Sequence, residues 1–370
     1  MENEKTNTRQ RLRRLIAFLV MAVLVCALLV PLTYLFRNTG YERSHITGIK
    51  REGPLDMVYI GGSAAFVFWQ PLKAWNDCGF TSYNYATNSI DLENIRFYIR
   101  EVLKTHRPEL FVIGIRSAAY WDYPVNDTAL RNGADSMDIS LNRMAFVYDY
   151  LHKHSFSGEE KDAMSPELLK YRLPYYLELM KYHSNYDALS SEANWLAIGN
   201  RGSAENKGWE WIYKHKAIDT PSGFVTDELA ELPEPELRTL RELMDFCKAE
   251  GLKVLFAVCP YSISREDYAK YNTVKAIAEE YGFGFFNAND CLDDMGIDFA
   301  TDFYNPDHVN CFGAEKYTAY LEKYITEHYN LPDHRSDAAY ASWDAAFARF
   351  SAEEKDAKER ILALMNDPEQ

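Results

Sequence analysis

Short apolar runs alternate with longer helix-like stretches in two parts of this chain, from about residue 55 to 118 and from about residue 235 to 330. The apolar runs predict strands at residues 57–60, 82–86, 110–115, 252–258 and 283–287. The helix-like stretches predict helices at residues 92–104, 236–249, 265–281 and 314–328. Strands that alternate with helices build βαβ units. The pattern therefore predicts an α/β fold of three layers, in which helices cover both faces of a mostly parallel sheet.

The alternation stops between residues 116 and 234, which we interpret as one large helical insertion in an α/β domain of residues 55–330. This stretch is polar, aromatic and mostly helical by pattern, with clearer helices predicted at residues 141–152 and 166–182. Two interpretations of its tryptophans stay open: the core of a helical subdomain, or a surface that stacks on sugar rings. These tryptophans are Trp121, Trp195, Trp209 and Trp211.

Two further segments flank this domain. Residues 37–54 are predicted to form a short connector. Residues 331–370, rich in Ala, Glu and Lys, predict a C-terminal extension with one or two surface helices.

The first 36 residues have a different pattern from the rest of the chain. Leu15–Phe36 is a run of 22 residues without a charge. At about 1.5 Å per residue it is long enough to cross a hydrocarbon core. Four arginines stand just before it, at positions 9, 11, 13 and 14. The excess of positive charge predicts a cytoplasmic N-terminus and places the chain after about residue 37 outside the cell.

A cleaved signal peptide is the alternative for this segment. Its apolar region is normally shorter, and a small-residue cleavage site follows it. The apolar run here ends in Leu35-Phe36-Arg37. We therefore predict an uncleaved single-pass anchor at residues 1–36, in the cell membrane.

Charge and composition narrow the possible ligands. The chain of 370 residues has a formal net charge of -15 and no basic stripe beyond its N-terminus, which excludes a nucleic-acid partner. The six cysteines are scattered without C-x-x-C spacing, and the acids near His308 do not match the spacing of a calcium loop. The sequence thus predicts neither a metal nor another cofactor.

Two motifs carry candidate chemistry. Residues 58–63, Val-Tyr-Ile-Gly-Gly-Ser, place Ser63 between a buried strand and a helix, at the edge where open α/β sheets bind ligands. The plain alternative is a tight turn with Ser63 as the helix N-cap. Residues 302–310, Asp-Phe-Tyr-Asn-Pro-Asp-His-Val-Asn, place His308 among acids after the last strand. A general base is expected at such a position.

Together these motifs resemble those of the SGNH/GDSL hydrolase superfamily. Gly61-Gly62-Ser63 is similar to its nucleophile block, and the segment that ends in His308 is similar to its closing Asp-x-x-His block. The resemblance covers about residues 55–118 and 235–330. It is closest to the membrane-anchored cell-envelope branch, which includes proteins similar to the D-alanine transfer protein of lipoteichoic acid synthesis and polysaccharide O-acetyl esterases and transferases. It implies a flavodoxin-like fold.

This chain departs from the family at the position of the acid that orients the histidine. The family carries Asp three residues before the His, and the residue here is Asn305. An Asn can accept a hydrogen bond from the ring but cannot balance the charge of an imidazolium, and the equivalent change in a serine protease costs about 10⁴ in rate. Asp302 is the preferred substitute, because Asp307 adjoins His308 and is expected to point away.

The resemblance also implies an oxyanion hole. The matching residues are the backbone at Gly62 and Ser63, together with Thr87 and Asn88, which are chosen by position alone. Arg116 stands at the carboxyl end of a strand, where it meets either an anionic substrate or a surface acid.

The resulting expectation is an extracytoplasmic, serine-dependent O-acyl esterase or acyltransferase. It would act on a cell-envelope glycan or teichoic acid through an acyl-Ser63 intermediate, without a cofactor. The alternative is a weak or inactive SGNH-like module that binds an envelope polymer or a membrane-bound acyltransferase.

Overall fold

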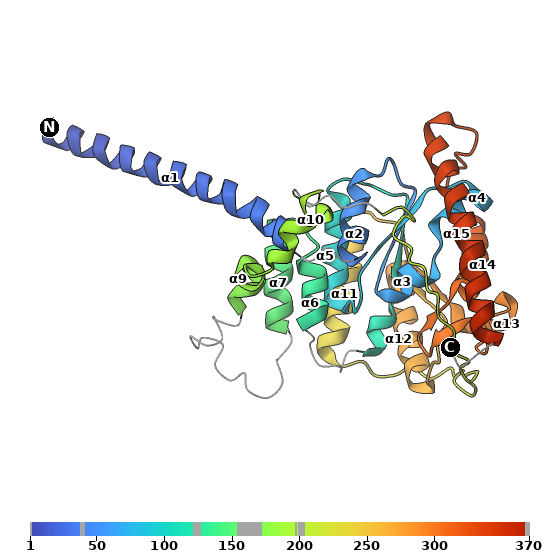
Figure 1. Cartoon of the computed structure of the whole chain (residues 1–370). Coiled ribbons are helices and arrows are strands. Elements are labelled where there is room, and N and C mark those ends of the chain that lie inside the picture. Colours follow the sequence, from blue (N-terminus) through green and yellow to red (C-terminus); the bar gives the residue numbers. More distant parts are fainter. Residues whose placement is uncertain are drawn as a thin grey trace. The chain divides into compact units, whose positions relative to one another are not determined.

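A computed structural model describes residues 2–37, 41–120, 127–153, 172–196, 198 and 204–366 of the chain (Figure 1). The chain divides into two compact units. The first consists of residues 1–39 and 162–201, and the second of residues 40–161 and 202–370. Each unit has its own packing.

The second unit is built on a parallel sheet of five strands in the order β2-β1-β3-β4-β5. This is one of the two common strand orders of doubly wound α/β sheets. The strand bounds are β1 Met57–Gly61, β2 Ser82–Ala86, β3 Leu110–Gly114, β4 Val254–Val258 and β5 Gly284–Asn287. Nearly every strand residue is buried, which explains why the strands appear in the sequence as continuous apolar runs.

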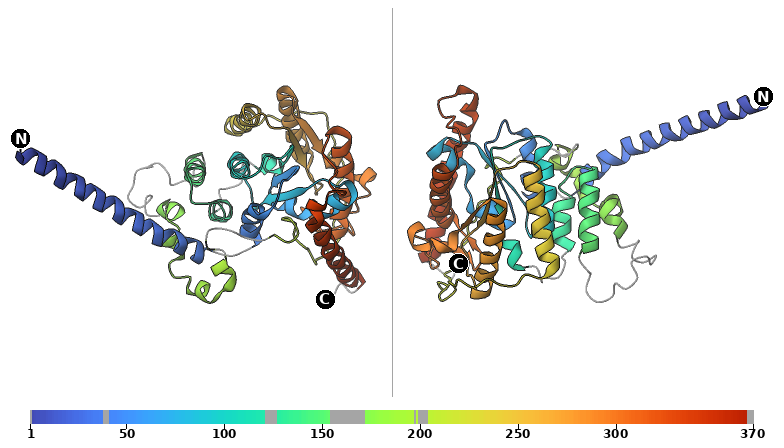
Figure 2. Two further views of the ribbon diagram at one scale, coloured as in Figure 1. Left: turned by 90° about the horizontal axis from the view of Figure 1, so that it is seen from above. Right: turned by 180° about the vertical axis from the view of Figure 1, so that it is seen from behind.

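Helices cover both faces of this sheet (Figure 2). One layer consists of α5 Leu92–Leu103, α11 Glu234–Ala249 and α12 Arg265–Tyr281, with α6 Asp127–Ala134 and α7 Leu141–Lys153 further out. The other consists of α3 Ser63–Phe68, α4 Pro71–Cys78, α14 Cys311–His328 and α15 Ala341–Asn366. The predicted α/β fold with a mostly parallel sheet is therefore confirmed.

The predicted strands and sheet-covering helices agree with the structure to within three residues at either end. The interior of the insertion differs from the prediction. Residues 204–233 contain neither helix nor strand, only a turn at residues 205–208 and a bend at Gly223, and we call this segment the strap. Trp209 of the strap is buried, and its ring packs edge-to-face on Phe350 of α15. This tryptophan therefore belongs to the core, while Trp121 lies outside the described residues.

Backbone hydrogen bonds to three other segments hold the strap in place. Asn84 N–H of β2 donates to Lys207 O at 2.9 Å, Glu210 N–H donates to Phe66 O of α3 at 3.0 Å, and Lys216 N–H donates to Phe303 O at 3.0 Å. The strap thus connects the sheet edge, the helix that begins at Ser63 and the segment that contains His308.

The predicted connector contains a helix that its sequence did not indicate, whereas the C-terminal extension is helical as predicted. The part of the predicted connector that the structure describes contains α2 Tyr41–Gly48 and the 3₁₀ turn η1 Ile49–Arg51. The α2 helix packs on β2, where the Tyr83 hydroxyl donates to His45 O at 2.7 Å. The C-terminal extension contains the 3₁₀ turn η5 Ala338–Tyr340 before α15, and α15 buries Trp343 and Phe350 against the domain.

The first unit is dominated by α1 Glu2–Phe36, within which Thr8–Phe36 is long and apolar enough to cross a membrane. Residues 172–196 pack against its C-terminal end and contain α9 Leu179–Tyr182, the 3₁₀ turn η3 Tyr186–Ser190 and α10 Glu192–Leu196. A helix was predicted at residues 166–182. Residues 166–171 lie outside the described residues, and the rest is helical at 172–176 and again in α9.

Gly208 provides a test of the strap's contact with the sheet. Its φ is +81°, and an added Cβ would lie 2.2 Å from the backbone oxygen of Asn84 in β2. We expect Gly208→Ala to lower the free energy of unfolding by about 3 kcal/mol or more, because backbone strain and a steric clash combine.

Gly223→Ala is the matched control, since Gly223 has a φ of +68° and no atom within 4 Å of the added Cβ. Strain alone should lower the free energy of unfolding by about 1 kcal/mol at this position. Denaturant unfolding in detergent, followed by circular dichroism, measures both variants. Equal losses would mean that the strap does not press on β2.

Candidate active site

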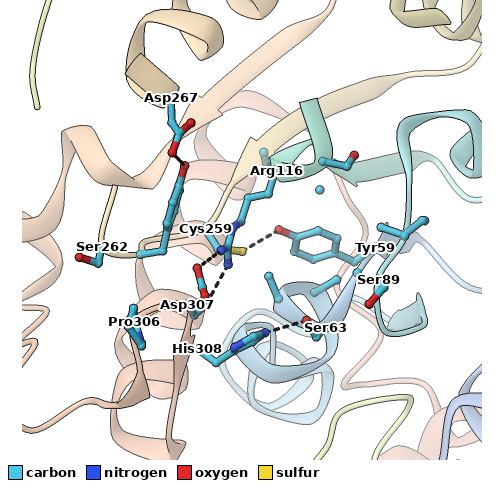
Figure 3. A pocket seen from close by; sticks show the side chains of 18 residues that line it. Tyr59, Ser63, Ser89, Arg116, Cys259, Ser262, Asp267, Pro306, Asp307 and His308 are labelled. Atoms are coloured by element: carbon cyan, nitrogen blue, oxygen red, sulfur yellow. Dashed lines mark hydrogen bonds and ion pairs between the residues drawn. The ribbon is translucent and has the colours of Figure 1, made fainter. Parts of the chain in front are cut away.

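A cavity of about 490 Å³ opens at the carboxyl ends of the strands. It lies where β1 and β3 are neighbours, at the point where the chain connections leave the sheet in opposite directions, which is the usual ligand site of an open α/β sheet. Ser63, Ser89, Arg116, Ser262 and His308 line it, from five different segments of the chain (Figure 3).

Ser63 is the first residue of α3, and Gly62 occupies the N-cap. This arrangement decides against the interpretation of Ser63 as the cap. The Ser63 hydroxyl faces the cavity instead, and its Oγ lies 2.7 Å from Nε2 of His308. The two side chains are 245 positions apart in the sequence, and the fold brings them within hydrogen-bond distance.

His308 is carried by a small antiparallel hairpin, β6 Phe303–Asn305 and β7 His308–Val309. The hairpin pairs Asn305 directly with His308, so the two side chains meet across it. Nδ1 of His308 lies 3.0 Å from Oδ1 of Asn305. Asn305 therefore occupies the position behind the imidazole that an acid would take in a serine triad.

The hydrogen bonds of the hairpin assign the histidine tautomer. The backbone N–H of Asp307 donates to the same Oδ1 of Asn305 at 2.9 Å, which identifies that atom as the amide oxygen. The oxygen accepts from Nδ1–H of His308, and the lone pair of Nε2 is left to face the Ser63 hydroxyl. This is the tautomer that a base needs in order to remove the serine proton.

Burial keeps the His308 ring neutral. Desolvation, together with the positive charge of Arg116, lowers the pKa of His308 to about 4, and the nearby Asp307 opposes this shift. The ring also stacks on Tyr304, with centroids 5.7 Å apart. At neutral pH the imidazole is a proton acceptor, as a general base must be, but it binds a proton more weakly than an ordinary histidine.

The expectation that Asp302 orients His308 is corrected by the structure. Asp302 is buried, and its carboxylate accepts from Lys316 Nζ at 2.8 Å and from the backbone N–H of Asp298 at 2.8 Å. Its backbone oxygen accepts from Asn310 N–H, and an added Cβ on Gly313 would lie 2.8 Å from that oxygen. Through Lys316, Asp302 holds the hairpin against α14. The lysine also balances its charge, so Asp302 does not orient His308.

Arg116 and Asp307 form an ion pair at the cavity wall. Nη2 of Arg116 donates to Oδ1 of Asp307 at 2.7 Å, and Nη1 donates to its backbone oxygen at 2.8 Å. The guanidinium also lies over the ring of Tyr261, 4.2 Å from the centroid. Of the two alternatives for Arg116, the structure therefore shows the pair with a surface acid. The Asp307 carboxylate is directed to the arginine.

The oxyanion candidates after β2 need revision. Thr87 is fully buried, its hydroxyl is hydrogen-bonded to Tyr98 at 2.7 Å, and it does not line the cavity. Asn88 is half-buried and lies outside the cavity lining as well. The next two residues, Ser89 and Ile90, line it instead, with Ser89 in the left-handed backbone region at a φ of 55°. Gly62, in contrast, borders the cavity as expected.

Several lining residues were missed in the sequence. Cys259, Tyr261 and Ser262 follow β4, and their position at a carboxyl strand end was the signal that could have found them. Tyr59 lines the cavity from within β1, and its hydroxyl lies 3.0 Å from the hydroxyl of Tyr317 in α14. Among the described residues, no group of three or more His, Cys, Asp or Glu side chains comes together to hold a metal ion.

Comparisons with known proteins do not identify this site. No protein-family model matches the chain, and no curated protein and no solved structure gives a significant match.

The burial of His308 generates a direct prediction. In proton NMR titrations of the detergent-solubilised chain, the His308 ring should have a midpoint near pH 4, because its neutral form is favoured by desolvation. The resonance is identified by its absence from the spectrum of His308→Gln. A midpoint near 6.5, the value of an unperturbed histidine, would contradict the burial of the ring.

Proposed function

We propose that this chain is an SGNH/GDSL-type, serine-dependent O-acyl esterase or acyltransferase, anchored by α1 and acting outside the cell on a cell-envelope glycan or teichoic acid. The observation that carries the proposal is the line of hydrogen bonds from Ser63 Oγ to His308 Nε2 and from His308 Nδ1 to Asn305 Oδ1. A nucleophile, a base and a group that orients the base are the parts that acyl transfer requires.

The order of events follows from these contacts. Ser63 Oγ attacks the acyl carbon while Nε2 of His308 takes the hydroxyl proton. The backbone N–H groups of Ser63 and Ala64, the first two residues of α3, precede the first hydrogen bond of the helix, which runs from Ala65 N–H to Gly62 O, and would stabilise the oxyanion. His308 then returns the proton to the leaving oxygen. In the second half, His308 deprotonates water or an acceptor hydroxyl, whose oxygen takes the acyl carbon from Ser63 Oγ, and His308 returns the proton to Ser63 Oγ.

Asn305 sets the limits of this chemistry. Its amide oxygen selects the correct ring tautomer, so the geometry of a general base is preserved. It brings no charge to stabilise the imidazolium, and the charge of Arg116 opposes imidazolium formation as well. We therefore propose an enzyme with a modest rate, slower than a site with a carboxylate at position 305.

The surroundings of Ser63 support a hydroxyl-rich substrate. Ser89 and Ser262 line the cavity and are exposed, so their hydroxyl groups can hydrogen-bond to the hydroxyls of a sugar. The apolar α1 helix supports a site of action at a membrane. Hydrolysis and transfer share the same acyl-serine.

One observation favours a second function. With Asn305 in place of an acid and a His308 pKa of about 4, the site could serve as a module that binds an acylated envelope polymer or a membrane-bound acyltransferase without turnover. The two functions differ in whether Ser63 reacts.

A fluorophosphonate probe tests this difference. We expect the probe to label the intact chain and the label to be absent from Ser63→Ala, because only a serine with a proton acceptor at 2.7 Å is activated. Ser262→Ala is the matched control, since it removes another hydroxyl from the same cavity and should keep the label. An intact chain that takes no label would establish the binding module instead.

Position 305 offers a second test. In Asn305→Asp the carboxylate should stabilise the imidazolium and raise the pKa of His308 above about 4, moving the acid limb of kcat/KM to higher pH. Hydrolysis of a short acyl ester should be about tenfold faster at neutral pH. Asn305→Ala leaves Nδ1 without its acceptor and should slow the reaction. An Asn305→Asp profile that coincides with that of the unaltered chain would exclude His308 as the base.

A further inference from the structure

The C-terminal end of α1 is enclosed by residues 172–196, which we call the clasp (Figure 1). The side-chain amide of Asn185 donates to Phe36 O at 2.9 Å, and that of Asn194 donates to Leu35 O at 2.7 Å. Backbone oxygens at a helix end lack partners within the helix, so these two amides cap α1. The clasp is thereby fixed to the end of the apolar helix.

A buried ion pair strengthens the attachment. The Arg37 guanidinium and the Glu178 carboxylate are paired through two hydrogen bonds, one of them from Nη2 to Oε1 at 2.7 Å, and both side chains are almost completely buried. Separating a buried ion pair leaves a charge without compensation in a poorly solvated place, which is strongly unfavourable. The clasp therefore moves with α1 as one body.

The length of the helix places the clasp at the edge of a bilayer. The side chains of α1 are mostly exposed as far as Leu29, and burial begins at Thr33. Counted from Leu15, just after the last arginine, to Val30, the uncovered helix is about 24 Å long, which is shorter than a hydrocarbon core of about 30 Å. If α1 spans the membrane, the difference of about 6 Å has to be covered by residues that the clasp surrounds.

The surface of the clasp suits that depth. Six large apolar or aromatic side chains of this short segment are exposed: Leu173 at 38%, Leu177 at 54%, Met180 at 45%, Tyr186 at 67%, Leu189 at 46% and Trp195 at 52%. The indole N–H of Trp195 already donates to Leu189 O at 2.8 Å, so the ring offers an apolar surface to its surroundings. Aromatic and aliphatic side chains of this kind gather at membrane interfaces.

We infer that the clasp is a membrane-interface element, whose exposed apolar side chains insert into the boundary between headgroups and acyl chains where α1 leaves the bilayer. The occupant of this surface is lipid. The inference goes beyond the proposed enzymatic function and is independent of it. Its consequence is that the unit holds the membrane at two places, through α1 and through the clasp around its end.

Site-directed spin labelling in vesicles of phosphatidylcholine and phosphatidylglycerol tests the inference with the full chain. Leu177→Cys and Leu189→Cys are labelled one at a time in a background with Cys26, Cys78 and Cys291 replaced by Ala, the other cysteines being buried. Collisions with oxygen and with a water-soluble nickel chelate report the depth of each label. For both labels, we expect the ratio of oxygen collisions to chelate collisions to be at least three times the ratio measured for Leu229→Cys, the control.

Leu229 is a matched control because it is 64% exposed and belongs to the second unit. A label on native Cys26, with Cys78 and Cys291 replaced, checks α1 itself, since Cys26 is exposed within the uncharged run of that helix. If Cys26 is not in the hydrocarbon, anchoring by α1 fails. If Cys26 is in the hydrocarbon but the clasp labels behave like Leu229→Cys, the inference about the clasp fails.

Two other outcomes also overturn the inference. Clasp labels that both reagents fail to reach would mean that a protein surface covers the clasp. Spin–spin broadening that vanishes on dilution with unlabelled chains would mean that a second copy occupies it.

Discussion

The contact between Ser63 Oγ and His308 Nε2 is the constraint around which the α/β unit is arranged. Each partner lies on a very short element, a six-residue helix and a hairpin whose second strand has two residues, and neither element is stable alone. Their surroundings hold them in place. The strap bonds to the backbone of both, and Thr318 of α14 donates to Phe68 O at the end of α3. The distance between nucleophile and base is therefore a property of the whole unit.

Electrostatics at this contact favour neutrality over charge. His308 lies between the amide of Asn305 and the hydroxyl of Ser63. In the part of the chain that the structure describes, the charges that act on its pKa belong to Arg116 and Asp307, and these two are paired with one another. The ring has the correct tautomer and a low pKa at the same time. His308 is therefore oriented to accept the proton of Ser63, but it binds that proton weakly. Asn305 is responsible for the tautomer, because its oxygen orients the ring without adding charge, while desolvation and the charge of Arg116 lower the pKa.

In the first unit, the important contacts are those at the C-terminal end of α1. An apolar helix that leaves a bilayer exposes its last carbonyl groups and brings an arginine to the boundary. Asn185 and Asn194 satisfy the carbonyls, and Glu178 neutralises Arg37. These contacts hold a short segment with an unusually apolar surface at the helix end. The same segment therefore caps α1 and presents apolar side chains beside the end of that helix.

Periodicity and composition alone determined the strands, the sheet-covering helices and the apolar span of α1. These are local features, since a buried strand or a helix face must repeat its apolar positions wherever it packs. Ser63 and His308 were also candidates in the sequence, because their two motifs together resemble the nucleophile and closing blocks of SGNH/GDSL hydrolases. Only the tertiary structure decided that Asn305, and not Asp302, meets the imidazole. A carboxylate acts on whichever group the fold brings near it, and Lys316, fourteen positions further along the chain, reaches Asp302. The course of the strap and the attachment of the clasp to α1 were also decided only by the tertiary structure, because both depend on contacts between distant segments, although part of the clasp lies in a stretch predicted as helix.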